Sequence, residues 1–281
     1  MTTPLDILPA SSIEAIAALC QRTMARPPTA DELRGGLFAP EEEAIVRGDP
    51  SVGIVVAVRN ADGGSIRLLA VDPARQREGH ATRLLRAAEA DLSKDRQDKT
   101  VVTIGADPPY YLFAGVETTQ LPMLCLLERL HYSRHEANFN MDVDLTDLPS
   151  AIEGPVIASP HDHDEVDAFM AAQWPNWRLE VLRALHKGTL VIERDAAGLS
   201  GFCAWNVTRR GLLGPVAVRL DLLGKGAGVG LLVSGLRHMH AAGYRKIEVS
   251  WVGPIVPYAK VGGMVGRVFF VYRKTINPPR S

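Results

Sequence analysis

Two short glycine-rich stretches hold the residues best suited to chemistry. The first turn is Gln76-Arg77-Glu78-Gly79-His80-Ala81, and the second turn is Leu223-Gly224-Lys225-Gly226-Ala227-Gly228. Each follows a strand-like apolar run and opens a helix-like run, an order that aims backbone N–H groups and the positive end of a helix at one point. Glycine permits positive φ angles and close approach of a ligand. Each turn therefore predicts a phosphate or pyrophosphate site, and a simple chain reversal is the alternative for either copy alone.

Neither turn fits the two common nucleotide-binding patterns. A Walker A loop needs Ser or Thr after its lysine, but Lys225 is followed by Gly226. A dinucleotide fingerprint needs a third glycine where the chain has Val229 or Leu231. The hairpin expected before the first turn also argues against a parallel dinucleotide-binding sheet. If the turns bind phosphate, they therefore belong to another phosphate-binding fold.

The two turns are parts of an internal repeat. One constant shift along the chain places Gly79 on Gly226, and residues 100–103 on residues 247–250. A strand, a turn, a helix and a second strand in constant register indicate a duplication. We expect a first domain at 1–145, a linker at 146–154 and a second domain at 155–281.

The elements that position the turns are predicted from hydrophobic periodicity and turn residues. In the first half we expect helices at 12–24, 29–36, 80–93 and 121–130, and strands at 53–59, 65–71, 100–105 and 137–144. A hairpin turn is expected at 61–64. In the second half we expect a helix opened by Asp162 and Glu165, strands at 188–194, 199–207, 213–219, 246–251 and 266–273, and helices at 228–242 and 255–261. Ser11 and Glu14 also have capping-box spacing. The fold class is α/β, with a mixed, mostly antiparallel sheet and flanking helices in each half.

The sequence around the turns resembles the GNAT superfamily of acetyl-CoA-dependent N-acetyltransferases. That family has a strand ending in V-x-P, then [QR]-x-x-G-x-[GA] and an amphipathic helix, and Val71-Asp72-Pro73 followed by the first turn matches every defined position. The second turn has its glycines, but Leu220 and Leu223 replace the proline and the Gln or Arg. Residues 258–263 resemble a second family pattern, Y-x-x-x-G-[FA], whereas Leu127 takes the tyrosine's place in the first half. The whole chain resembles a tandem GNAT protein, similar in layout to mycothiol-synthase-like members.

This resemblance implies that acetyl-CoA is the co-substrate. In the family, the strand before the turn pairs with the pantetheine arm and the turn amides hold the pyrophosphate. The cofactor-binding residues implied in the first half are Leu69, Ala70, Val71, Gln76, Arg77, Glu78, Gly79, His80, Ala81 and Thr82. Those implied in the second half are Val216, Ala217, Val218, Gly224, Lys225, Gly226, Ala227, Gly228 and Val229.

The resemblance also implies an acid for the departing thiolate and a base for the amine. We assign the acid to Tyr258, because a phenol with a pKa of about 10 is protonated at neutral pH; packing in the core is the alternative. Leu127 cannot do this chemistry, so the first half either is silent or uses Tyr110 or Tyr111. We expect catalysis in the second half and cofactor binding in at least the first. The base stays open among Glu117, Glu193 and Asp221.

The function expected is transfer of an acetyl group from acetyl-CoA to a primary amine, on a small molecule, by direct attack in a ternary complex. Three alternatives stay open: a catalytically decayed CoA-binding or ligand-sensing module, a protein N-acetyltransferase, and a structural dimerisation protein. Leu127 and Leu223 favour the decayed module. Trp174 and Trp177 could form aromatic walls of an acceptor pocket, with core packing as the alternative.

Composition narrows the class of protein further. The chain has 281 residues, of which 46% are hydrophobic and 22% charged, with a net charge of −1. These values exclude wholesale disorder and a highly basic nucleic-acid binder. We expect no membrane partner, no signal peptide and a cytoplasmic location. Three dispersed cysteines predict buried thiols, and the histidine pairs predict no metal site. The sequence does not predict an oligomeric state.

Overall fold

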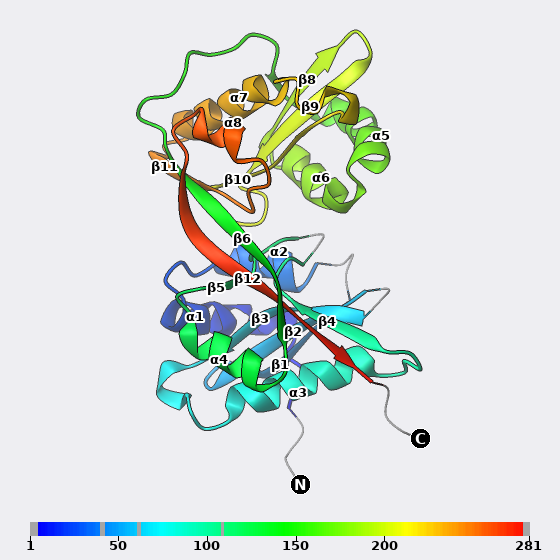
Figure 1. The fold of residues 1–281 in the computed structure, drawn as a ribbon, viewed down its shortest axis with the longest axis vertical. Helices are drawn as coiled ribbons and strands as arrows, with labels where there is room; N and C mark the ends of the chain where they lie inside the picture. Colours follow the sequence, from blue (N-terminus) through cyan, green and yellow to red (C-terminus); the bar gives the residue numbers. More distant parts are fainter. Residues whose placement is uncertain (1–4, 40–42, 61–62, 108–109, 278–281) are drawn as a thin grey trace. The chain divides into compact units, whose positions relative to one another are not determined.

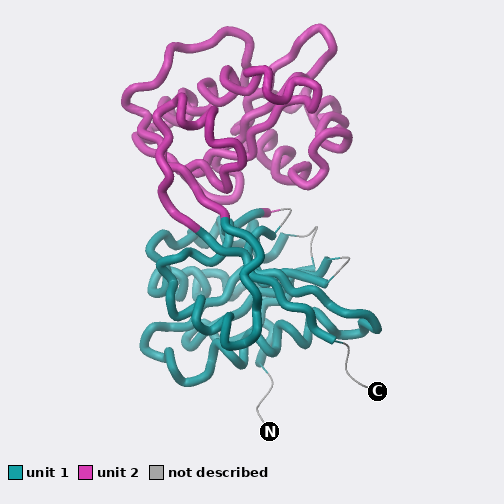
Figure 2. Tube along the Cα trace, in the orientation of Figure 1, with its two compact units in different colours: residues 1–107, 111–137, 269–281 teal, residues 108–110, 138–268 magenta. Residues whose placement is uncertain are grey.

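The computed structural model describes residues 5–39, 43–60, 63–107 and 110–277. The chain forms two compact units, drawn in teal and magenta in Figure 2. Unit 1 comprises residues 1–107, 111–137 and 269–281, and unit 2 comprises residues 108–110 and 138–268. Among the described residues, no helix has the length and apolar character needed to cross a membrane.

Unit 1 is a mixed sheet with helices on both faces (Figure 1). Its elements are α1 (Ile13–Thr23), α2 (Ala30–Leu37), β1 (Ala44–Asp49), β2 (Gly53–Asn60), β3 (Gly63–Val71), α3 (His80–Ser93), β4 (Thr100–Ile104), β5 (Val116–Glu117) and α4 (Leu121–Arg129). The sheet order is β1-β2-β3-β4-β12, where β12 is Met264–Ile276 and β5 pairs with it. Within this order β3 and β4 pair in parallel, and the other neighbours pair antiparallel. The two parallel strands are joined by the first turn and α3, as the sequence predicts.

The sheet of unit 1 separates two hydrophobic clusters, because successive side chains of a strand point to opposite faces. Ile54 and Val56 of β2 pack with α1 and α2. Val55 and Ala57 of the same strand pack with α3 and α4. The apolar stripe of α3 thus covers one face, and it fixes the direction in which the helix leaves the first turn.

Unit 2 repeats this arrangement. Its elements are β6 (Ser133–Asp144), β7 (Val156–Ile157), α5 (His163–Gln173), α6 (Arg178–His186), β8 (Leu190–Asp195), β9 (Gly198–Trp205), β10 (Leu212–Val218), α7 (Gly228–Ala241), β11 (Lys246–Val249) and α8 (Ile255–Ala259). The sheet order is β6-β11-β10-β9-β8-β7, and β10 and β11 pair in parallel. A strand, the second turn, α7 and a parallel strand follow one another as in unit 1. The expected α/β fold with two related domains is confirmed.

The limits of the two units differ from the domains expected at 1–145 and 155–281. The long strands β6 and β12 each belong to both units (Figures 1 and 2). Residues 141–144 of β6 pair with β11 of unit 2, and residues 272–276 of β12 pair with β4 of unit 1. The last strand of the chain therefore completes the first sheet. Sequence periodicity cannot reveal this exchange, because it does not specify the partner of a strand.

Several local details also differ from expectation. The strand β1 and the helix α6 are additions, and α1 begins after a 3₁₀ turn at Ala10–Ser12, with no side-chain cap from Ser12. The capping box before α5 joins Ser159 to Asp162, because a 3₁₀ turn precedes the helix, and Glu165 instead pairs with Arg194. The helix expected from Thr29 does begin with a capping box. Residues 61 and 62 of the expected hairpin turn lie outside the described residues.

Candidate functional site

The two turns have positive φ angles at the same two equivalent positions. In the first turn Arg77 and Gly79 have φ angles of 69° and 83°, and in the second Gly224 and Gly226 have φ angles of 74° and 84°. Positive φ is uncommon for a residue with a Cβ, so Arg77 holds a position that glycine fills in the second copy. The duplication in the sequence is thus also a duplication of geometry.

The glycines of both turns border open space. A Cβ added at Gly79, Gly224 or Gly226 would meet no described atom within 4 Å. Their small size is therefore not required by packing within the chain. The left-handed backbone favours glycine at these positions, and the space next to each glycine is free for a ligand that approaches closely.

The strand before each turn separates from its parallel neighbour. In unit 1, β3 pairs with β4 only over Gly63–Ile66, and the β2–β3 register shifts between Val56 and Ala57. In unit 2, β10 pairs with β11 only at Leu212 and Leu213, next to a register shift. Beyond these points the described strand end has no partner in β4 or β11. That edge of its backbone can therefore pair with an extended ligand, as an added strand would.

A cavity of about 900 Å³ lies in unit 1 beside the first turn. Nine of the ten cofactor-binding residues predicted in the first half line it: Leu69, Ala70, Val71, Gln76, Arg77, Gly79, His80, Ala81 and Thr82. The end of β3, the turn and the start of α3 thus form one continuous wall. This volume is within the range of ligand pockets for cofactor-sized molecules.

The rest of the wall comes from residues that the sequence did not single out. They lie at the end of α1, next to the turn and along α4: Thr23, Met24, Arg75, Thr119, Gln120, Leu121, Pro122, Met123, Cys125, Leu126 and Arg129. Helical spacing separates the α4 members from the buried face that Leu124 and Leu127 mark, but it does not indicate that they border a cavity. Cys125 is exposed, so the prediction of three buried thiols is wrong for this one; it lies on the cavity side of α4.

The charges around the cavity are mainly positive. Three arginines, Arg75, Arg77 and Arg129, line it. Glu78, which the resemblance implied as a cofactor-binding residue, does not: its carboxylate accepts hydrogen bonds from Arg75 Nε at 3.1 Å and His80 Nε2 at 3.0 Å. The bond from Arg75, and then that from His80, lowers the pKa of Glu78. The carboxylate therefore stays charged and partly offsets the positive rim.

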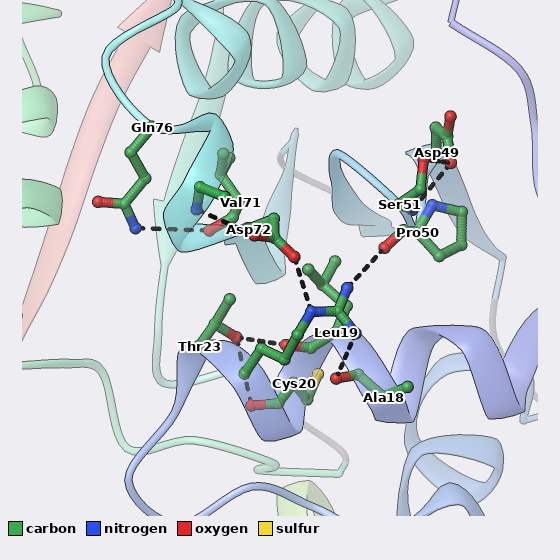
Figure 3. A network of polar contacts seen from close by, with 12 residues as sticks. Ala18, Leu19, Cys20, Thr23, Asp49, Pro50, Ser51, Val71, Asp72 and Gln76 are labelled. Carbon is green, nitrogen blue, oxygen red and sulfur yellow. Dashed lines mark hydrogen bonds and ion pairs between the residues drawn. The ribbon is translucent and has the colours of Figure 1, made fainter.

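The end of α1 is tied to the start of the turn by Arg22. Its Nε donates to Asp72 Oδ2 at 2.6 Å, and its other nitrogens donate to the carbonyls of Ala18 and Pro50 (Figure 3). This bond from Arg22, followed by one from the Ala74 amide, lowers the pKa of Asp72. The spacing between the helix and the strand end is thus held from outside the cavity.

The residues predicted in the second half lie on β10, in the second turn and at the start of α7, and they do not line this cavity. Trp174 follows α5, and its Nε1 donates to the carbonyl of Val218 at 3.0 Å. Its ring stacks on Trp177 at a centroid distance of 5.2 Å. The two tryptophans singled out from the sequence therefore contact each other, and Trp174 also contacts the strand before the second turn.

The predicted acid, Tyr258, lies on α8 in the core of unit 2. Tyr258 is 9% exposed and belongs to the hydrophobic cluster that also contains Val218 and the buried residues of α7. Burial, with a smaller contribution from Cys203, raises the pKa of the Tyr258 phenol. Leu127, at the corresponding place in unit 1, is fully buried.

The other candidate acids and bases have partners or lie elsewhere. The Arg183 guanidinium covers the buried ring of Tyr110 at 3.5 Å. Asp221 is paired with Arg219 at 2.7 Å, a bond that lowers the pKa of Asp221. Burial and then Asp195 raise the pKa of Glu193 on β8. Tyr110, Tyr111, Glu117, Glu193 and Asp221 do not line the cavity.

The first half of the chain matches a known domain family. Residues 25–112 match the family model described as an acetyltransferase (GNAT) domain. This segment contains the end of β3, the first turn and α3. No curated protein sequence matches the chain.

Solved structures resemble the chain over nearly its whole length. A GCN5-related N-acetyltransferase from Sphaerobacter thermophilus is 18% identical, with a TM-score of 0.69 over 99% of this chain and 97% of that one. A tandem GNAT protein from the clavulanic acid biosynthesis pathway is 15% identical, with a TM-score of 0.69 over 99% of each chain. The glucosamine N-acetyltransferase region of a fungal multi-domain GH3 β-N-acetylglucosaminidase is 18% identical, with a TM-score of 0.76 over 96% of this chain. The chain spans 38% of the length of that last protein. At these identities the likeness establishes the fold.

Proposed function

From the premise that the chain is a tandem GNAT-fold protein with an acetyltransferase domain in its first half, we propose that it is an N-acetyltransferase that binds acetyl-CoA in the cavity of unit 1. The acceptor proposed is the primary amine of a small molecule. The observation that carries the proposal is the cavity wall: the strand end, the turn and the helix start that a cofactor would need line a single space of about 900 Å³.

The residues of the wall suit the parts of acetyl-CoA. The turn would receive the pyrophosphate, because Gly79 leaves open space above amides at the start of α3. The side chains of Arg75, Arg77 and Arg129 add positive charge there. The edge of Leu69–Val71 that faces away from β2 would pair with the amides of the pantetheine arm.

The reaction proposed is a direct acyl transfer. The amine nitrogen attacks the thioester carbonyl carbon, the carbon–sulfur bond breaks, and the thiolate takes up a proton while the amine loses one. Holding both reactants in one site supplies much of the rate, since well-oriented intramolecular reactions gain roughly 7–11 kcal/mol. The unit 1 wall contributes by fixing the thioester arm along β3 and excluding other orientations.

One structural relative supports an amine on a small molecule as the acceptor. It is a glucosamine N-acetyltransferase region, and its fold covers 96% of this chain. A protein N-acetyltransferase and a CoA-binding module without catalysis are the second candidates. Leu127 favours the non-catalytic CoA-binding module, because a fully buried apolar side chain stands where the family pattern has its tyrosine.

A turnover assay tests the proposal. The full chain is incubated with acetyl-CoA and a panel of amino sugars, amino acids, polyamines and peptides with free N-termini, and release of the CoA thiol is followed. We expect amine-dependent thiol release with an acetylated small molecule identified by mass spectrometry. Acetylation of peptides alone would favour the protein acetyltransferase. Saturable acetyl-CoA binding with no turnover on any amine would favour the binding module.

The acid role assigned to Tyr258 has its own test. Because Tyr258 does not line the cavity of unit 1, we expect Tyr258→Phe to leave kcat for acetyl transfer unchanged. A positioned general acid contributes roughly 100-fold or more, so the two outcomes are well separated. A loss of that size in kcat, with unchanged affinity for acetyl-CoA, would show that Tyr258 is the general acid and that acetyl transfer takes place in unit 2.

A further inference from the structure

The first helix of each unit, α1 in unit 1 and α5 in unit 2, is followed by a different type of residue. Helices α1 and α5 each have 11 residues and are followed by Met24 and Trp174, respectively. Thr23 and Met24 line the cavity of unit 1, next to the end of β3. Met24 thus forms part of an open cavity wall in unit 1, whereas the equivalent residue of unit 2, Trp174, carries a large indole side chain.

In unit 2 this helix end is bonded directly to the strand end. Trp174 Nε1 donates to the carbonyl of Val218, the last residue of β10, at 3.0 Å. The neighbouring Gln173 Oε1 accepts from the amide of Leu220 at 3.1 Å. A carbonyl and an amide in the segment between the end of β10 and the second turn are therefore already hydrogen-bonded within the protein.

In unit 1 the residue equivalent to Gln173 is Thr23, and its side chain bonds back to its own helix instead. The hydroxyl of Thr23 donates back to the carbonyls of Leu19 at 3.0 Å and Cys20 at 3.3 Å (Figure 3). The carbonyl of Val71, the last residue of β3, receives a contact of 3.5 Å from Gln76 Nε2, at the outer limit of hydrogen bonding. The strand end of unit 1 can thus pair with a ligand at little cost.

Trp174 is held firmly where it lies. Its ring is nearly parallel to that of Trp177, with 18° between the planes, and both rings pack against the hydrophobic cluster that α5, α6, β8 and β9 form. Pro175 follows it and opens a 3₁₀ turn. A ligand that paired with β10 would have to displace both the hydrogen bond and the stacked ring.

The second turn itself keeps the features of a phosphate site. Gly224 and Gly226 have positive φ angles and open space above them, and Lys225 supplies a positive charge. Building on the proposed function, we propose that Trp174 closes the cofactor groove of unit 2, so that the protein has one working acetyl-CoA site, in unit 1. The second site is closed by a single side chain in front of an intact turn.

Calorimetric titration of the full chain with acetyl-CoA tests this inference. We expect one binding equivalent for the natural chain and two for Trp174→Met, which introduces the residue type of unit 1. Trp177→Met is the matched control: it removes the stacking partner but keeps the indole hydrogen bond to Val218, so it should remain at one equivalent. Adding Gly226→Asp to Trp174→Met should abolish the second site. If Trp174→Met does not fold, Trp174→Leu replaces it in the titration, provided that its circular dichroism spectrum matches that of the natural chain.

The Gly79→Asp background separates this inference from the proposed function. With the first site disabled, Trp174→Met should restore one equivalent that Gly226→Asp then removes. Two equivalents in the natural chain, or no restoration in a folded variant, would overturn the role of Trp174. No binding to the natural chain but one equivalent for Trp174→Met would support the closed groove and contradict the proposed site in unit 1.

Discussion

Replacing Gly79 by aspartate is expected to weaken acetyl-CoA binding strongly while the chain stays folded. The new carboxylate would lie where the turn amides and the start of α3 attract an anion. Two like charges about 4 Å apart repel by about 1 kcal/mol in bulk water and about 4 kcal/mol near a protein surface, which corresponds to a roughly 5- to 1000-fold loss in affinity. The side chain also occupies the open space that lets a ligand approach the backbone. Calorimetry with acetyl-CoA measures the loss.

Two variants serve as controls for this prediction. Gly79→Ala adds a Cβ at a φ of 83° without charge, so it reports backbone strain of about 1–2 kcal/mol and only a small part of the affinity loss. Gly226→Asp makes the same change in the second turn and should leave binding intact, because Trp174 closes that groove. Unchanged affinity in Gly79→Asp would show that the cofactor does not use the first turn.

The turns can be predicted from the sequence because their determinants are local. The helix expected at 80–93 has the bounds observed for α3, since its apolar spacing and the glycine before it both lie within a few residues. The strand end and the turn follow from the same short segment, so most of one cavity wall is predictable. The backbone conformation of such a turn depends mainly on the residues within it, so it can be predicted without knowing its tertiary contacts.

The opposite wall cannot be predicted in this way. Which face of α4 borders the cavity depends on where that helix packs, and the exposure of Cys125 follows from that packing alone. The contact between Trp174 and Val218 joins residues 44 positions apart, and no periodicity encodes it. The partner of β12 is likewise set by the assembled sheet, because an apolar strand suits either unit.

Asp107→Asn is expected to give the largest loss of stability in unit 1. The register shift opposite Val56 and Ala57 leaves Arg67 of β3 as the extra residue, and its guanidinium donates to Asp107 and to the carbonyl of Gly36 at the end of α2. Ser65 donates to the same carboxylate. Arg67 and Asp107 are each 5% exposed. This buried network joins β3, α2 and the segment after β4.

Removing one member of a buried ion pair leaves the other charge uncompensated, which costs about 3–5 kcal/mol. We therefore expect a clearly lower urea midpoint for Asp107→Asn, measured by circular dichroism. The exposed pair between Asp167 and Arg178 provides the matched control, and Asp167→Asn should leave the midpoint unchanged because solvent screens that pair. The double variant Arg67→Met/Asp107→Leu should recover much of the loss, since two apolar residues leave no buried charge. Equal midpoints for Asp107→Asn and the natural chain would mean that the charge of Arg67 is balanced by other groups, and that the frame of the cavity does not depend on this pair.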